Sequence, residues 1–401
     1  MPSVLRRFVV PVIAAVATTI TAFAVSLPAR ATTTAIDASL TRSIRTAMST
    51  STAHAWSVVI DVADRGRVVD VSGTYSMLPA STQKLFTTLP VLLREPNARF
   101  STSFAATKGP SLGVLHADLV VHSSGDPTLM AADLVRLAKR VHDAGVRKVV
   151  GRLVVDIGSL PTVRVRPGWK AAYVPDDIAP LSPFPVSGDN LSTTSAYVSD
   201  PTNANIAYLR ARLKAAGVGI TGASVTARHV VTPRVFTSHS SATFASIVRT
   251  TLLVSQNFYA EQLFSAIGAS AVSQTASAAG ASSDVTSDGS GLSLRDHVTS
   301  EAEVALLEYA AGSSAADALR GSLPVACQSG TLKHDLCASS TAGAVFAKTG
   351  SLDDVKTLAG YTTDGLGRAV TFAILTNSDR DTDAAMASMQ KVLTVVRNYT
   401  G

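Results

Sequence analysis

The stretch Pro79-Ala80-Ser81-Thr82-Gln83-Lys84-Leu85-Phe86 decides how this sequence is interpreted. It is typical of a helix start, and Pro90 limits how far that helix continues without a kink. Residues three positions apart share one face of a helix, so Lys84 lies within proton-transfer reach of the Ser81 hydroxyl. A serine becomes a nucleophile when a neighbouring base takes its proton, and a desolvated lysine serves as such a base. The stretch therefore predicts a reactive Ser81 activated by Lys84.

Two further triplets strengthen a signal that is weak on its own. Among the ten lysines, Lys391 also follows a serine at this spacing, Ser388, within a predicted C-terminal helix that has no further motif. By contrast, the chain also contains Ser255-Gln256-Asn257, its only Ser-x-Asn, and Lys348-Thr349-Gly350, its only Lys-Thr-Gly. The three motifs in this order are typical of active-site-serine penicillin-binding proteins and class A β-lactamases.

Other stretches point to one branch of these proteins. They are Pro79-Ala80-Ser81, Gly125-Asp126-Pro127-Thr128-Leu129, Asp288-Gly289-Ser290-Gly291-Leu292-Ser293, Ser329-Gly330-Thr331-Leu332 and Ala347-Lys348-Thr349-Gly350-Ser351. With them, residues 36–398 resemble the D-alanyl-D-alanine carboxypeptidase/endopeptidase family of low-molecular-mass (class C) penicillin-binding proteins. The resemblance implies an α/β (α+β) fold: a transpeptidase domain like those of penicillin-binding proteins and β-lactamases, with an antiparallel sheet flanked by helices, and an inserted second domain.

The resemblance also implies catalytic roles for four residues. Ser81 would attack the carbonyl of the penultimate D-alanine and form an acyl-enzyme, with Lys84 accepting its proton. Ser255 would pass a proton to the leaving amine. Asn257 would hold Lys84 and the substrate amide in place.

Four residues of the last motif would bind the substrate. Lys348 and Thr349 would bind the terminal carboxylate from an exposed cationic strand. Gly350 would leave the strand edge free for the substrate backbone. The amide of Ser351, together with that of Ser81, would form the oxyanion hole.

The implied substrates are peptidoglycan stem peptides, and β-lactam antibiotics would act as covalent inhibitors. The chemistry needs no metal or organic cofactor. Two alternatives remain. A β-lactamase uses the same motifs but needs a well-placed water, and Glu261 is predicted to be a helix-surface residue rather than the carboxylate that would activate one. A catalytically weak wall-binding protein of the same fold is the second alternative.

The chain is long enough for two domains, with 401 residues of which 46% are apolar. Short strand-like runs between about Arg99 and Arg234 interrupt the more helical remainder. We therefore predict a discontinuous serine peptidase domain at 32–98 and 236–401, and an inserted domain at 99–235. The 174 positions between Ser81 and Ser255 agree with the insert that the family has there.

The N-terminus is typical of an export signal. Arg6 and Arg7 precede an apolar run over 8–25, and Ala29-Arg30-Ala31 ends the segment with small residues. We predict a signal peptide at 1–31 and an extracytoplasmic protein, in the cell wall, in the periplasmic space or secreted; an uncleaved leader would act as a membrane anchor.

The charged residues and cysteines narrow the function further. Three basic residues behind the net charge of +6 lie in the leader, and no Lys/Arg cluster remains to bind nucleic acid. Cys327 and Cys337 are the only cysteines, and in an exported protein we expect them to form a local disulfide rather than two free thiols. With only His334 nearby, a closed zinc site is not expected.

Four predictions concern local structure. A continuous helix is expected at 246–267, and the Ala- and Ser-rich tract at 269–287 is expected to be a surface loop, shorter than the family's usual segment. Asp288 is expected to order a loop rather than carry protons. Trp169 is expected either to line the substrate cleft or to be a buried structural residue.

Overall fold

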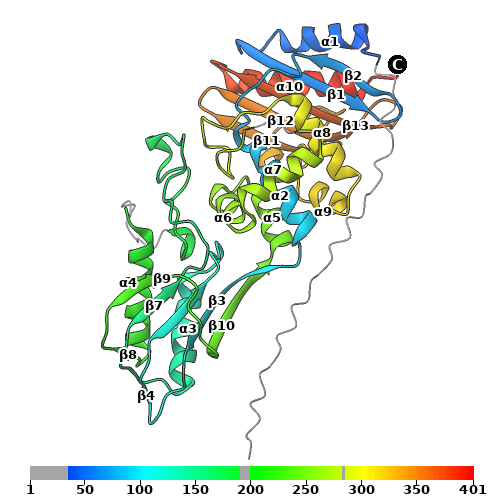
Figure 1. Ribbon diagram of the computed structural model, residues 1–401. Coiled ribbons are helices and arrows are strands. Elements are labelled where there is room, and N and C mark those ends of the chain that lie inside the picture. The colour runs from blue at the N-terminus through cyan, green and yellow to red at the C-terminus, as the bar shows by residue number, and fades with distance from the viewer. Residues whose placement is uncertain (1–34, 190–198, 282–284) are drawn as a thin grey trace, which may run out of the picture.

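The computed structural model describes residues 35–189, 199–281 and 285–401, so the predicted signal peptide lies outside the described residues. Two parts, each with its own sheet and buried core, make up this structure (Figure 1). The larger part combines residues from both ends of the sequence. The smaller part is formed by residues between them.

A five-stranded antiparallel sheet in the order β11-β12-β13-β1-β2 forms the centre of the larger part. The strands are β1 (Ala55–Val62), β2 (Gly66–Val71), β11 (Phe346–Leu352), β12 (Val355–Thr363) and β13 (Ala369–Asn377). Strands β1 and β2 coincide with runs rich in Val and Ile, because β-branched side chains fit a pleated sheet. Strand β1 pairs with both β2 and β13, and this pairing joins the two ends of the chain.

Helices cover both faces of this sheet. Helices α1 (Ala38–Met48) and α10 (Thr382–Arg397) pack on the face to which Ile60 contributes, because successive strand side chains point to opposite faces. Val59 belongs to the core on the other face, beneath α8 (Ser300–Ala311). The remaining helices of that face are α2 (Gln83–Arg94), α5 (Phe244–Leu253), α6 (Asn257–Ile267), α7 (Ala269–Ala278) and α9 (Ala316–Arg320).

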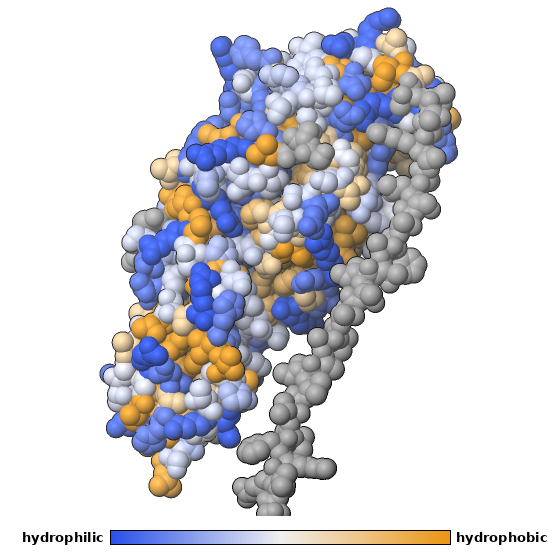
Figure 2. Space-filling view, viewed as in Figure 1, coloured by the Kyte–Doolittle hydropathy of each residue, from blue (hydrophilic) through white to orange (hydrophobic). Residues whose placement is uncertain are grey.

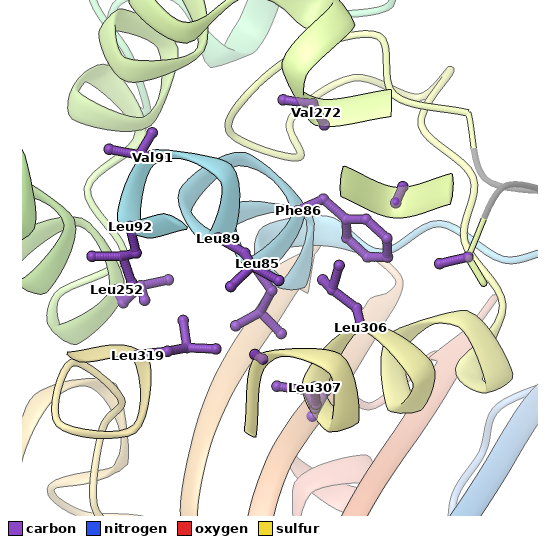
Figure 3. Packing of buried hydrophobic residues seen from close by; sticks show 14 of the residues in the cluster. Leu85, Phe86, Leu89, Val91, Leu92, Leu252, Val272, Leu306, Leu307 and Leu319 are labelled. Carbon is purple, nitrogen blue, oxygen red and sulfur yellow. The ribbon is translucent and has the colours of Figure 1, made fainter. Parts of the chain in front are cut away.

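Helix α2 lies in the middle of these helices and is buried from Gln83 to Leu92. Figure 3 shows its Leu85, Phe86 and Leu89 among apolar side chains of the surrounding helices. The helix continues through Pro90 to Arg94, so this proline does not end it. A buried helix of this kind provides a rigid base for the serine that precedes it.

Two predictions of local structure were wrong. The helix expected at 246–267 is divided into α5 and α6, because Ser255 has a positive φ of 59° between them. The tract at 269–287, expected to be a loop, begins with α7. Small side chains at 271, 272, 275 and 276 repeat at helical spacing and are buried, so a weakly apolar segment packs closely on its neighbours.

The smaller part has two sheets. A mixed five-stranded sheet has the order β10-β3-β5-β7-β9, and a three-stranded parallel sheet has the order β4-β6-β8. The strands are β3 (Arg99–Ala106), β4 (Val114–Leu115), β5 (Leu119–Ser123), β6 (Lys148–Val149), β7 (Leu153–Asp156), β8 (Gly219–Ile220), β9 (Ser224–Ala227) and β10 (Arg234–Thr243). Helices α3 (Ala131–Asp143) and α4 (Pro201–Ala215) contribute to its separate core.

Strands β3 and β10 lead from one part to the other (Figure 1). Arg99 pairs with Thr243, and the pairing continues to Ala106 and Arg234. We propose that the inserted domain spans the whole of β10 and ends near Thr243, beyond the boundary predicted at 235. Its separate core supports this division.

Polar and apolar residues are intermixed over the face of both parts that Figure 2 shows. Within the described residues, no helix combines the length and apolar character that crossing a membrane requires.

Candidate active site

Ser81 lies in a short 3-10 helix, η1 (Ala80–Thr82), immediately before α2. Ala80 has a positive φ of 48°, and this turn leaves the Ser81 side chain partly exposed. Two glycines approach the turn closely: a Cβ atom on Gly291 would collide with Ala80 O, and one on Gly350 would lie 2.9 Å from Ser81 N. The turn is therefore fixed by backbone from two distant segments.

Lys84 is fully buried, and its Nζ contacts three oxygen atoms. It lies 2.7 Å from Ser81 Oγ, 2.7 Å from Asn257 Oδ1 and 2.6 Å from the Ser290 carbonyl oxygen. A neutral amine can donate to the amide and carbonyl oxygens and still accept the Ser81 hydroxyl proton with its lone pair. The three partners therefore fit a lysine that acts as a base.

Burial lowers the pKa of Lys84 to about 7. The carboxyl groups of Asp288, Glu261 and Asp296 oppose this shift. Lys84 is thus neutral in an appreciable fraction of molecules at neutral pH, as a general base must be.

Ser255 and Asn257 approach the centre from the break between α5 and α6. The positive φ of Ser255 ends the helical path, and Asn257 starts α6 with its side chain directed at Lys84. Asn257 Nδ2 also donates to the Asp177 carbonyl oxygen at 3.0 Å. The break therefore aims both polar side chains of the second motif at the site.

Lys348 differs from its sequence prediction because it is fully buried rather than exposed on a strand. Its Nζ donates to Ser255 Oγ at 2.9 Å and to the Thr349 carbonyl oxygen at 2.6 Å. Burial and the nearby Lys84 hold the pKa of Lys348 well below its usual value. The side chain therefore contacts Ser255 directly.

The rest of β11 forms the wall of the cleft. Thr349 Oγ1 lies 2.7 Å from Thr331 Oγ1, and Ser351 is exposed to the cleft. The cleft has a volume of about 460 Å³. It is lined by Ser81, Tyr173, Asp177, Ser255, Asn257, Leu292, Thr331, Asp335, Thr349, Ser351, Leu352, Asp353, Lys356 and Met386.

Cys327 and Cys337 form the predicted disulfide. It closes the loop that contains the short 3-10 helix η4 (Gly330–Leu332), and this loop brings Thr331 and Asp335 to the cleft. Among the described residues, no group of three His, Cys, Asp or Glu side chains is arranged to hold a metal ion.

The sequence interpretation missed a buried polar layer behind Lys84. Glu261, predicted to lie on a helix surface, is completely buried. Asp288 is also buried, and it accepts hydrogen bonds from backbone amides that include Gly291 N at 2.6 Å, which agrees with the predicted loop-ordering role. Trp169 donates to Asp288 Oδ2 at 2.6 Å and is 9% exposed, so it is a buried structural residue. The sequence contains one sign of this burial, because Glu261 is an acidic residue within an apolar helix.

Comparison with known proteins identifies the class. The model of the D-Ala-D-Ala carboxypeptidase 3 (S13) family matches residues 40–194 and 184–396. A carboxypeptidase of Mycobacterium tuberculosis is 30% identical over 341 residues, covering 75% of this chain and 71% of that protein. A D-alanyl-D-alanine carboxypeptidase from an Actinomadura strain is 25% identical over 438 residues, covering 86% and 81%.

Solved structures agree on the fold. Penicillin-binding protein 4 of Haemophilus influenzae matches with a TM-score of 0.81 and 20% identity, covering 89% of this chain and 99% of that one. The chain is thus a serine peptidase of the penicillin-binding type. It belongs to the D-Ala-D-Ala carboxypeptidase 3 (S13) family. The predicted fold class and the predicted serine-type D-Ala-D-Ala carboxypeptidase activity are confirmed.

Proposed function

We propose that Ser81 is the nucleophile with which this protein removes the terminal D-alanine from peptidoglycan stem peptides. The observation that carries the proposal is the contact between Ser81 Oγ and Lys84 Nζ, together with the burial that lowers the pKa of Lys84 to about 7. A buried neutral amine in hydrogen-bond contact with a serine hydroxyl is the arrangement that serine activation requires.

The reaction then follows from the surrounding groups. Ser81 Oγ attacks the carbonyl carbon of the penultimate D-alanine while Lys84 takes the hydroxyl proton. The negative charge on the carbonyl oxygen is stabilised by the backbone amides of Ser81 in η1 and Ser351 on β11. Collapse of this intermediate releases D-alanine, and water hydrolyses the acyl-enzyme.

Ser255 supplies the proton to the leaving amine. Its hydroxyl oxygen accepts a hydrogen bond from Lys348 Nζ, which favours transfer of its own proton toward the cleft. Thr349 and Ser351 offer hydroxyl groups to the substrate carboxylate, with the Lys348 amine behind them. Lys348 therefore serves both the proton donor and the carboxylate site.

β-Lactams would acylate the same serine, because their strained amide occupies the position of the peptide bond. A protein with this activity acts where peptidoglycan is made and remodelled. We propose that residues 1–31 direct its export to that compartment.

Release of D-alanine from a synthetic peptide ending in L-Lys-D-Ala-D-Ala tests the function. We expect the wild-type protein to release D-alanine, and Ser81→Ala to lose this activity while remaining folded. Ser388→Ala is the matched control, because Ser388 and Lys391 form the other Ser-x-x-Lys pair, on α10, and this variant should remain active. A folded Ser81→Ala variant that still releases D-alanine would refute the proposal.

A further inference from the structure

The Ser290 carbonyl is one of the two fixed acceptors that orient Lys84. It accepts from Lys84 Nζ at 2.6 Å, and the other acceptor is Asn257 Oδ1. If this carbonyl rotated away, the amine would lose the partner that directs its lone pair toward Ser81. The position of the base therefore depends on what holds the backbone on both sides of Ser290.

The peptide unit of this carbonyl is held by Asp288, which accepts from Gly291 N at 2.6 Å. Glu261 of α6 holds the two peptide units before it. Its Oε1 accepts from Gly289 N at 2.8 Å and from Ser290 N at 2.9 Å. Ser290 N also donates to Asp288 Oδ1 at 3.0 Å. Ser290 is thus fixed at its amide by carboxylates, while its carbonyl is directed at Lys84.

The second carboxylate oxygen of Glu261 is held by the inserted region. Glu261 Oε2 accepts from Arg166 Nε at 2.8 Å, and Arg166 Nη2 donates to Ser265 Oγ at 2.7 Å. The guanidinium also lies over the Phe264 ring, 5.3 Å from its centroid. A single arginine from the region between β7 and α4 therefore contacts three residues of α6.

We propose that Glu261 is a positioning residue that orients the base Lys84 through the backbone of Ser290, and that Arg166 of the inserted domain keeps Glu261 in this geometry. The proposal rests on the proposed role of Lys84 as the base for Ser81. It gives the inserted domain a part in arranging the catalytic centre, because Arg166 binds Glu261, Glu261 binds the Ser290 N–H, and the Ser290 carbonyl binds Lys84.

The charged groups around Lys84 affect its pKa, and the pH dependence of the reaction measures this effect. Lys84 faces Glu261 from α6, Asp288 and Asp296 from the loop before α8, and Lys348 from β11. Burial and Asp288 raise the pKa of Asp296 to about 10, so Asp296 is neutral at working pH. The charge on the Glu261 carboxylate, where that group is ionised, supports protonation of Lys84.

Burial and Asp288 raise the pKa of Glu261 to about 7 while Arg166 lowers it, so Glu261 and Lys84 titrate as a coupled pair. A neutral side chain at 261 removes a charge that raises the pKa of Lys84. The acid limb of the pH profile, where the acylation rate rises with pH, should therefore move to lower pH. A simple packing defect would lower the rate without moving the limb.

The test is the second-order rate of acylation by a fluorescent penicillin, measured from about pH 5 to about pH 9. Glu261→Gln keeps the size of the side chain but removes its charge and turns an amide NH₂ toward either Arg166 or the backbone amides. We expect the acylation rate at high pH, where it no longer changes with pH, to fall about 10- to 100-fold. This is the usual cost of displacing a base by up to about 1 Å. The acid limb should move to lower pH at the same time.

Arg152→Gln is the matched control. Arg152 also pairs with a carboxylate in the inserted region, that of Asp118, but the pair is on the surface. Its rate and pH profile should equal those of the wild type. An unchanged profile in folded Glu261→Gln would overturn the proposal, and so would a lower rate with an unmoved acid limb, which would make Glu261 a packing residue only.

Arg166→Gln keeps the proposal testable if Glu261→Gln does not fold. Without the arginine, Glu261 loses the group that lowers its pKa and becomes protonated more readily, so the limb should move in the same direction. No shift in this variant would also overturn the proposal. A wild-type protein that the penicillin does not acylate would instead contradict the proposed function, so the two failures can be distinguished.

Discussion

Lys84 is fully buried and contacts three oxygen atoms, among them Ser81 Oγ. The acylation rate should therefore depend on the protonation state of this lysine. Burial lowers its pKa to about 7, so the amine is mostly protonated below that pH and mostly neutral above it. Only the neutral form can accept the Ser81 proton. We expect the acylation rate of the wild type to rise as pH increases through about 7 and then to level off. Stopped-flow measurements of acylation against pH would show this, and a rate that is flat down to pH 5 would contradict it.

Trp169 offers a second test at the scale of one residue. Its indole N–H donates to buried Asp288, so Trp169→Phe keeps most of the packing but leaves a carboxylate oxygen short of a donor. We expect a loss of about 1.5 to 3 kcal/mol in the free energy of unfolding, typical of a hydrogen bond to a charged group. Denaturant titration measures this loss. Trp56→Phe, at the other tryptophan of the chain, is the control. Equal losses in the two variants would contradict a stabilising role for the hydrogen bond from Trp169 to Asp288.

Residue types and spacing identified the groups that meet at the site, but not their environments. Ser81, Lys84, Ser255, Asn257 and Lys348 were all predicted site residues, and the fold brings them together. The exposure of Lys348 and the surface position of Glu261 were predicted wrongly. Burial of a charged side chain is decided by elements that pack on it from distant parts of the chain, and a local pattern does not contain that information.

At the scale of the elements, a break within a helix and a helix of small residues were the features that the sequence did not predict. In β1 and β2, runs rich in Val and Ile suit a sheet that has both faces covered. The break between α5 and α6 was missed because apolar residues continue at helical spacing on both sides of Ser255. Helix α7 was missed because alanine and serine give a weak apolar signal, although small side chains suit close packing.

The approach of β11 to η1 makes Gly350 sensitive to substitution. A Cβ atom there would collide with Thr357 Oγ1 and would lie 2.7 Å from Pro79 O. Gly350→Ala should therefore push β11 away from Ser81 and displace the oxyanion-hole amide. We expect acylation to slow by about 100- to 1,000-fold, the usual cost of losing one such donor. The circular dichroism spectrum should be that of the folded wild type.

Gly312→Ala is the control for this substitution. Gly312 follows α8 with an ordinary φ of −86°, and the nearest atom to an added Cβ is 3.7 Å away. Its acylation rate should remain that of the wild type. A Gly350→Ala protein that is acylated at the wild-type rate would show that the close approach of the two segments has no catalytic role.

At the scale of the whole molecule, the three motifs are far apart in sequence and meet because of the sheet topology. Strand β1 pairs with β13, which brings the C-terminal strands beside the segment that leads to Ser81. The inserted region between β3 and β10 then contributes Arg166 and Trp169 to the layer behind the site. The sequence predicted an insert and its approximate limits, and the resemblance to a family implied the overall fold. Neither contained the contacts between the two parts, which involve residues outside the three motifs.

The central claim is that Ser81 forms the covalent acyl-enzyme. The most direct measurement is the intact mass of the purified protein before and after exposure to benzylpenicillin, made in parallel on the wild type and Ser81→Ala. We expect the wild type to gain the mass of one benzylpenicillin molecule and Ser81→Ala to gain none. The same adduct on folded Ser81→Ala, or a wild type that stays unmodified while the drug remains intact, would contradict the claim.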